Sequence, residues 1–323
     1  MTPAALPTTD FSMHLFFPLA LAITLFFAVS NQSCNAAIPL GIWSWNQDCL
    51  MTKSARSELL GFCKKEGISH IDQHVSMEQK NGHLHLVNAN KIALLVQEAA
   101  AMDITVSALR GDRKMFIAKS HDARLQEITA LVEWNRQLPN GISLLGIKYD
   151  VEPYLTDQWE AGGQSRRQMM REYLQCLEKL QQYLQRHEPE LLLSVDIPFW
   201  WDKSELELDF DGKSKPFVNH IQDRVSSVAL MSYRRSAKDV LRLSEQELGY
   251  SRSKNRNHSV ALGLNFRSAS GTEEVTTFAG YPPADFRTAL SSLRKTLSDS
   301  KHVRCIMLHD YESLVKYLER ETD

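Results

Sequence analysis

The stretch from Ile142 to Val151 reads ISLLGIKYDV and is followed at once by Glu152 and Pro153. It is apolar along most of its length, which suits a strand of a parallel sheet that is buried on both faces. An amphipathic helical pattern follows over residues 166–187. The stretch therefore predicts one strand–helix unit of an α/β protein.

The same unit recurs on both sides of this stretch. The predicted strands are 39–45, 69–75, 104–109, 142–151, 191–197, 225–232, 259–265 and 303–309, and the predicted helices are 54–66, 90–102, 123–137, 166–187, 217–222, 237–248, 283–297 and 311–320. Strict alternation of this kind predicts a single (β/α)8 TIM barrel over residues 37–323. An open doubly wound sheet is the alternative, which the missing Gly-rich loop after the first strand disfavours. We expect residues 202–215 to form a polar surface loop.

An apolar run precedes the predicted barrel. Leu15–Val29 (LFFPLALAITLFFAV) carries no charge and is shorter than the roughly 20 residues that a membrane-spanning helix needs. With the small residues up to Ala36 it is typical of a secretory signal peptide, so we expect residues 1–36 to be removed. The protein would then be secreted or periplasmic, with no membrane span. A lipoprotein acylated at Cys34 and a retained membrane anchor are the alternatives.

Composition bears on partners and cofactors. Lys and Arg number 37 against 39 Asp and Glu, so the formal net charge of −2 gives no long-range attraction to nucleic acid. No CxxC or HxxxH spacing indicates a metal site, and we expect no cofactor and a monomer. Export would permit disulfides between Cys49, Cys63, Cys176 and Cys305. Cys176 and Cys305 lie within apolar patterns, which predicts buried free thiols.

The ends of the predicted strands supply the candidate site, because barrel active sites lie at the C-terminal ends of the strands. Four of the six tryptophans fall there, and clustered Trp and Tyr rings can stack on the apolar faces of sugars. We therefore expect an oligo- or polysaccharide to bind. The candidate contact residues are Trp43, Trp45, Asp72, His74, Arg110, Tyr154, Asp196, Trp200, Trp201, Arg234, Asn265, Arg267, His309 and Asp310.

Asp150 and Glu152 are the strongest catalytic candidates. Residues two apart in a strand face the same side, so both carboxyl groups should point into the barrel mouth. Two neighbouring carboxylates resist simultaneous ionisation, so one carboxyl should have a raised pKa, as a general acid in glycosidic cleavage requires. Lys148 shares their face and would oppose that rise. The alternative is that both carboxylates form salt bridges at the rim.

The segment 145–152, LGIKYDVE, resembles the DGxDxDxE motif on the fourth strand of the family 18 glycoside hydrolases, which include chitinases. The resemblance implies that Glu152 is the general acid and that Asp150 orients the N-acetyl group of the substrate. Leu145 and Lys148 stand where the family has its first two Asp residues. The YDVEPY run at 149–154 is also similar to a bacterial group of YD(V/I)EPY barrels, remotely related to family 18.

A second resemblance lies on the sixth predicted strand. Residues 231–234, MSYR, are similar to the family's Met-x-Tyr-Asp, which implies that Tyr233 hydrogen-bonds the acetamido oxygen of the substrate. Arg234 replaces the Asp of that motif, and His309 stands where the family has a Trp on the eighth strand. Asp196 on the fifth strand is also similar.

Glycosidases that use a protein nucleophile carry a Glu at the tip of the seventh strand. Here that strand ends at Asn265, and Glu273 and Glu274 come later, in a loop. Their position favours a mechanism assisted by the substrate's own acetamido group. The resemblance thus implies a secreted glycoside hydrolase of β-linked, N-acetylhexosamine-containing glycans, with Glu152 as acid/base.

Two other functions remain as alternatives. Lys148 and Arg234 motivate a catalytically inactive barrel that binds carbohydrate. A metal-dependent deacetylase or phosphodiesterase is the second, with Asp72, His74 and His309 as metal ligands.

Overall fold

The computed structural model describes Met1 and residues 37–319. Apart from Met1, the predicted signal peptide (residues 1–36) lies outside the part described, as does the end of the last predicted helix. The barrel strands are β1 (Leu40–Ser44), β2 (Ile68–His74), β5 (Thr105–Gly111), β6 (Gly146–Asp150), β7 (Leu192–Pro198), β10 (Ser227–Met231), β11 (Val260–Asn265) and β12 (Val303–His309). They are all parallel and close in the order β1-β12-β11-β10-β7-β6-β5-β2. The predicted (β/α)8 barrel is therefore confirmed.

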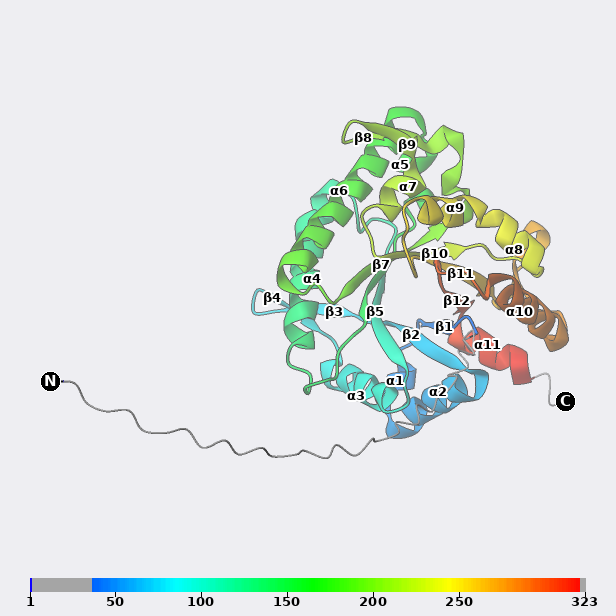
Figure 1. Ribbon diagram of the computed structural model, residues 1–323, viewed down its shortest axis with the longest axis horizontal. Coiled ribbons are helices and arrows are strands. Elements are labelled where there is room, and N and C mark those ends of the chain that lie inside the picture. Colours follow the sequence, from blue (N-terminus) through cyan, green and yellow to red (C-terminus); the bar gives the residue numbers. More distant parts are fainter. Residues whose placement is uncertain (2–36, 320–323) are drawn as a thin grey trace. The chain divides into compact units, whose positions relative to one another are not determined.

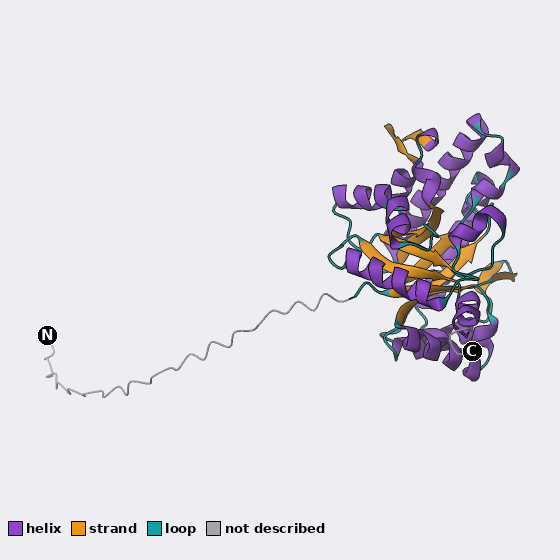
Figure 2. Cartoon of the chain, turned by 90° about the vertical axis from the view of Figure 1, so that its right-hand side faces the viewer, coloured by secondary structure: helices purple, strands orange, loops and turns teal. Residues whose placement is uncertain are grey.

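Helices surround the sheet on its outer side, as Figures 1 and 2 show. They are α1 (Asp48–Met51), α2 (Lys53–Glu66), α3 (Ala89–Ala100), α4 (His121–Asn135), α5 (Asp157–Glu160), α6 (Gly163–His187), α7 (Phe217–Gln222), α8 (Ala237–Leu243), α9 (Glu245–Ser253), α10 (Pro283–Leu297) and α11 (Tyr311–Leu318). The single helix predicted over 237–248 is wrong. Ser244 separates α8 from α9, and its hydroxyl donates to the Val240 carbonyl at 2.9 Å, which satisfies a carbonyl at the end of α8. No helix of the described chain is long and apolar enough to cross a membrane.

Two antiparallel hairpins extend the barrel. They are β3 (Met77–Lys80) with β4 (His83–Leu86) and β8 (Glu207–Phe210) with β9 (Lys213–Pro216). The polar loop predicted over 202–215 is therefore wrong, because the second hairpin occupies most of it. Asn-Gly and Asp-Gly turns join the strands, and Asn81 and Asp211 have φ of 52° and 50°. These dipeptides favour tight hairpin turns and were the available sequence evidence.

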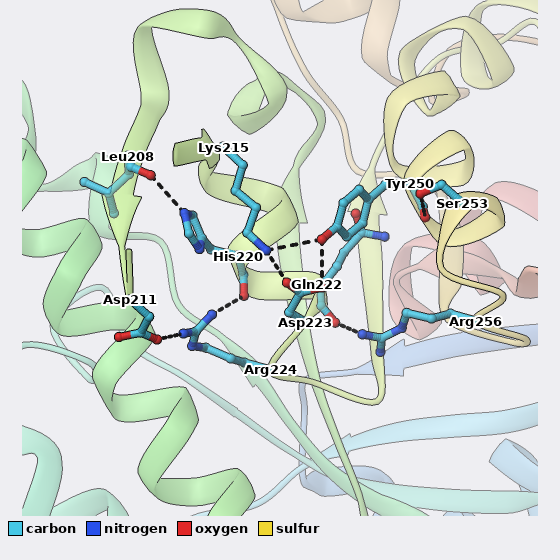
Figure 3. A network of polar contacts seen from close by, with 10 residues as sticks. All are labelled: Leu208, Asp211, Lys215, His220, Gln222, Asp223, Arg224, Tyr250, Ser253 and Arg256. Atoms are coloured by element: carbon cyan, nitrogen blue, oxygen red, sulfur yellow. Dashed lines mark hydrogen bonds and ion pairs between the residues drawn. The ribbon is translucent and has the colours of Figure 1, made fainter. Parts of the chain in front are cut away.

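The second hairpin is tied to α7 and α9 by polar contacts, shown in Figure 3. Lys215 pairs with Asp223, and Tyr250 on α9 donates a hydrogen bond to Asp223 at 2.8 Å. His220 contacts the Leu208 carbonyl at 2.9 Å. These contacts fix the hairpin against the helices that follow β7.

The barrel interior is distinct from the large apolar core between strands and helices. Its apolar cluster consists of Trp43, Leu109, Ala229, Ala261, Cys305 and Met307. Polar side chains of β2, β6 and β7 fill the remaining interior positions. The cysteines of the described chain, Cys49, Cys63, Cys176 and Cys305, are all buried and free. This confirms the prediction of buried free thiols at Cys176 and Cys305.

Candidate active site

A pocket of about 540 Å³ opens where the barrel strands end. Its volume is typical of small-molecule sites. The lining residues are Trp43, Trp45, Gly111, Asp112, Arg113, Asp150, Glu152, Leu155, Asp196, Met231, Tyr233, Arg267 and His309. The structure thus brings together the three predicted catalytic residues and five of the predicted contact residues.

Strand β6 and the turn after it position the paired carboxyl groups. Lys148 and Asp150 lie on the inner face of β6, whereas Tyr149 packs outward against Phe116 at 5.2 Å between ring centroids. The 3-10 turn η2 (Pro153–Leu155) follows directly and leaves Glu152 at the mouth of the pocket. Both carboxyl groups therefore face the cavity, as the alternation predicted.

Asp150 is the carboxyl whose pKa is raised well above its usual range. Burial is the main cause, and the nearby carboxylates of Asp196 and Glu152 add to it. Its Oδ1 is closed off from solvent and has no hydrogen-bond partner among the described residues. A buried polar atom without a partner is unfavourable. Asp150 therefore offers a buried carboxyl group with a raised pKa and unused hydrogen-bonding capacity.

Tyr154 supports Glu152 rather than lining the pocket. Its hydroxyl donates a hydrogen bond to Glu152 Oε1. Its ring meets the edge of the half-buried Trp200, with centroids 5.3 Å apart. The contact between the phenol and the carboxylate fixes the Glu152 side chain.

The expectation that Trp200 and Trp201 form sugar platforms is wrong. Neither lines the pocket, because the turn η3 (Phe199–Asp202) directs both rings toward the helices outside the barrel. Trp201 is fully buried, stacked on Trp159 at 5.8 Å and packed against Phe217 at 5.0 Å. The pair belongs to an aromatic core.

Trp43 forms the floor of the pocket. Its Nε1 donates to Asp196 Oδ2 at 3.0 Å, and the edge of His309 meets its ring at 5.5 Å. Lys148 Nζ lies 4.9 Å from the ring centroid. Trp43 is almost fully buried, so only a small part of the ring is open to a ligand.

Below this floor lies a buried ionic network centred on Lys148. Its Nζ is 2.6 Å from Asp72 Oδ2 and 3.1 Å from Asp196 Oδ1. Asp72 also pairs with His70 at 2.9 Å. These partners lower the pKa of Asp72 and raise that of Lys148, whereas burial raises the pKa of Asp196 to about 6. Asp72 is thus part of the interior, and its predicted contact with ligand is wrong.

The metal hypothesis finds no support in the donor positions. Asp72 is engaged by Lys148, and His74 lies behind Trp45, with ring centroids 5.7 Å apart. Among the described residues no group of three or more His, Cys, Asp or Glu side chains could hold a metal ion. Asp72, His74 and His309 therefore do not form a ligand set.

Tyr233 forms one wall of the pocket. Its ring stacks on His309 with centroids 5.6 Å apart, and it lies so close to β11 that a Cβ at Gly263 would be 2.7 Å from Tyr233 Cε1. Burial lowers the pKa of His309 to about 4, which keeps the imidazole neutral near pH 7. Asn265 Oδ1 lies 3.2 Å from His309 Nδ1 and accepts from the Arg267 backbone at 3.0 Å. Asn265 therefore lies outside the pocket lining and positions His309 and Arg267 through hydrogen bonds.

Two predicted contact residues, Arg110 and Arg234, lie outside the pocket lining. Arg110 lies on the outer face of β5 and pairs with Glu127 of α4 at 2.9 Å. Arg234 places its guanidinium 5.4 Å from the Phe199 ring. The expectation is wrong for Arg110, whose guanidinium is engaged by Glu127. Asp310 is different, since it caps α11 through the Ser313 amide and lies beneath the rim.

Several lining residues, most of them at the end of the third barrel strand, are not among the predicted contact residues. Gly111, Asp112 and Arg113 line the pocket, as does Leu155. A Cβ at Gly111 would lie 2.9 Å from the Asp150 carbonyl oxygen, so this glycine allows β5 to approach the catalytic strand. The sequence signal for these lining residues is a glycine followed by two charged residues at the end of a strand. Glu273 and Glu274 lie on the exposed turn η5 (Gly271–Thr276), outside the lining.

Solved structures with a similar fold include glycosidases. A chitinase from Bacteroides thetaiotaomicron is 14% identical over 86% of this chain and 91% of that chain, with a TM-score of 0.53. A family GH18 chitinase from Cycas revoluta, in complex with allosamidin, is 11% identical over 86% and 96%, also with a TM-score of 0.53. A GH5_18 variant from Streptomyces cattleya, in complex with Manβ1-4GlcNAc, is 12% identical over 84% and 70%, with a TM-score of 0.54. The sequence matches no protein-family model and no curated protein. At these identities the likeness establishes the shared barrel fold.

Proposed function

We propose that this protein is a glycoside hydrolase that cleaves β-linked, N-acetylhexosamine-containing glycans with assistance from the substrate's acetamido group. One observation carries the proposal: the enclosed, unpartnered Oδ1 of Asp150 lies in the same pocket as Glu152 and Tyr233. Because Asp150 lines this pocket, its carboxyl group is an acceptor within reach of an acetamido N–H bound there. The fold shared with solved chitinases is consistent with that assignment.

The general acid arises from a proton that Asp150 and Glu152 exchange. Burial raises the pKa of Asp150 and so favours its protonated form in the free protein. When the acetamido N–H donates to Asp150, the ionised form of that carboxyl is favoured and its pKa falls. The proton then passes to Glu152, the member of the pair that Tyr154 holds at the pocket mouth. Glu152 thereby becomes the general acid.

The reaction then proceeds in two steps. The acetamido oxygen, accepting a hydrogen bond from Tyr233, attacks the anomeric carbon while the glycosidic C–O bond breaks and Glu152 gives its proton to the leaving oxygen. Water next attacks the anomeric carbon of the cyclic intermediate, and Glu152 takes a proton from that water. The acetamide is regenerated and Glu152 is again protonated.

The aromatic lining would form the sugar subsite. Trp43 supplies part of the floor and Trp45 part of the wall. The ring of Trp45, rather than its buried Nε1, is the part that can contact a sugar. Tyr233 and His309 form the facing wall.

The direct test is Glu152→Gln assayed on N-acetylglucosamine oligomers. Loss of the acid should lower kcat by about 10²- to 10⁴-fold while the oligomer still binds. Glu273→Gln, an exposed carboxyl outside the pocket, is the matched control and should retain full activity. An unchanged rate in Glu152→Gln would remove Glu152 from the mechanism. Binding by the wild-type protein without any turnover would instead identify the inactive carbohydrate-binding barrel.

We also propose that residues 1–36 direct export and are removed. The apolar run Leu15–Val29 supports this proposal. N-terminal sequencing of the protein recovered from outside the cytoplasm should begin at Ala37. A recovered chain that still contains Leu15–Val29 would contradict cleavage.

A further inference from the structure

Two arginines stand at the pocket on opposite sides of the barrel. Arg113 follows β5, and Arg267 follows β11. In the closed strand order these two strands are four places apart in either direction, so they face each other across the barrel. Asp150 ends β6 and Glu152 follows it, on the arc of strands that joins β11 to β5. A ligand that spans the pocket therefore has a guanidinium group at each end.

Both guanidinium groups retain unused donors. Arg267 donates from Nε to Asp310 Oδ2 at 2.6 Å, its side chain is 54% exposed, and its terminal nitrogens have no hydrogen-bond or ion-pair partner in the described part of the chain. Arg113 donates from Nη1 to the Leu155 carbonyl at 3.2 Å, and no other hydrogen bond of its guanidinium occurs there. Each arginine can therefore still offer an N–H pair to a carboxylate.

The acidic side chains of the pocket are better supplied with partners. Glu152 accepts from Tyr154, and Asp196 accepts from Trp43 and faces Lys148. Asp112 accepts from the Lys114 backbone at 2.8 Å. The two arginines therefore place unused guanidinium N–H donors at opposite ends of the pocket.

We propose that the substrate is an acidic glycan in which an N-acetylhexosamine alternates with a carboxylate-bearing sugar. This inference rests on the proposed function. An N-acetylhexosamine held between Asp150 and Tyr233 would place one acidic sugar on each side of itself. One carboxylate would then meet Arg113 and the other Arg267, and each guanidinium fork matches a carboxylate in shape and charge.

The test compares three probes with the Glu152→Gln protein, in which slow turnover permits calorimetric binding measurements. The probes are a hexasaccharide of alternating N-acetylglucosamine and glucuronate, a tetrasaccharide of alternating N-acetylglucosamine and N-acetylmuramate, and the neutral N-acetylglucosamine hexamer. The first two distinguish a ring carboxylate from a lactyl carboxylate. We expect at least one acidic probe to bind about tenfold more tightly than the neutral hexamer at low salt and to lose that advantage near 1 M salt.

The arginine variants identify the source of this preference. Arg113→Gln and Arg267→Gln should each weaken binding of the preferred acidic probe by about tenfold and change binding of the neutral hexamer by less than about twofold. Arg242→Gln is the matched control, since Arg242 is 59% exposed and ion-paired with Asp239 on α8. It should leave binding of every probe unchanged.

Different failures have different meanings. If the neutral hexamer binds as tightly as both acidic probes, or if the arginine variants weaken all probes equally, the acidic substrate is overturned and the glycosidase proposal stands. If no probe binds, both proposals are overturned.

Discussion

At the scale of single residues, the pairing of Asp150 with Glu152 was predictable from strand alternation, but the division of roles within the pair was not. The raised pKa belongs to Asp150, whose Oδ1 is enclosed and which faces two other carboxylates. The role of Tyr154 likewise becomes clear only in the structure. In sequence it is a rim aromatic, whereas in the structure its hydroxyl binds Glu152.

Tyr154→Phe tests the hydrogen bond to Glu152. Because a hydrogen bond to a charged group contributes about 1.5–3 kcal/mol, its loss should lower kcat on N-acetylglucosamine oligomers by about ten- to a hundredfold and change KM little. Steady-state kinetics measure both constants. Tyr183→Phe, a half-buried tyrosine of α6 that packs on His187, is the control and should behave as wild type. A Tyr154→Phe protein with normal kcat would show that the hydroxyl does not position the acid.

Lys148 replaces an acidic residue of the resembling motif, and the structure explains how a lysine is accommodated there. Two buried carboxylates, of Asp72 and Asp196, share its charge. Lys148→Met would leave Asp196 without a counter-charge and Asp72 with His70 alone, so we expect it to lower the free energy of unfolding by about 3–5 kcal/mol in urea denaturation. Lys80→Met removes a lysine from an exposed pair with Glu78 and should cost less than about 1 kcal/mol.

The same network predicts a rescue. The pKa of Asp72 is lowered, so Asp72 is the ionised partner that most needs Lys148. The double variant Asp72→Asn with Lys148→Met should therefore be more stable than Lys148→Met alone. If the second substitution adds its full cost to the first, the two charges are not coupled.

The wrong predictions at this scale share a physical origin. Arg110 lies at a strand end, where position in the sequence gives no indication of which way a side chain turns. Arg110 points outward because the inner position of β5 belongs to Gly111, which contacts the Asp150 backbone. Trp201 was expected on the rim, but the turn after β7 directs it into the helical layer. Such directions depend on packing partners that are remote in sequence.

At the scale of elements, strands and long helices were predictable because their apolar residues recur with a clear period. The helix over 283–297 has the bounds that the pattern predicts. Apolar periodicity does not reveal the hairpins, because their strands are short and polar; the Asn-Gly and Asp-Gly turns are their only clear sequence signal. The break at Ser244 was missed since the apolar period continues across it.

Helix α9 carries a buried acid that should make stability depend on pH. Both carboxyl oxygens of Glu247 are without a hydrogen-bond partner among the described residues, and burial raises its pKa to about 8. The folded protein therefore holds a proton that the unfolded chain releases above its ordinary glutamate pKa. The free energy of unfolding should be highest below about pH 4.5 and fall by on the order of 1 kcal/mol per pH unit until about pH 8.

Glu247→Gln removes this titration while keeping a neutral polar group of the same size. We expect the variant to show a flatter melting temperature between pH 5 and pH 8 and to be more stable than wild type at pH 8. Calorimetry across this range measures both effects. Glu245→Gln, an exposed position on the same helix, should keep the wild-type slope. An unchanged slope in Glu247→Gln would assign the pH dependence to other groups.

At the scale of the whole molecule, the count of eight strands was sufficient to predict closure. Pairing of β1 with β12 completes the ring and brings residues from both ends of the described chain, such as Trp43 and His309, into contact at the pocket floor. The location of the site followed from the fold alone. The identity of the residues that line the site did not follow from the fold. The loop after β5 and the buried ion pairs of Lys148 come together only when the barrel closes.

Burial in the closed, folded barrel also determines how reactive the cysteine thiols are. Cys49, Cys63, Cys176 and Cys305 are buried and unpaired, and burial raises their pKa values to about 11 or 12. Thiolate is the reactive form, so these thiols should be inert in the native protein. In a Cys34→Ser chain, we expect a thiol reagent at pH 8 to modify none before denaturation and all four after it. Because the reagent can reach Cys305 only when the barrel opens, its modification rate in mild urea should follow global unfolding. Rapid modification of the native protein, or fewer than four thiols after denaturation without reductant, would contradict a closed barrel with free cysteines.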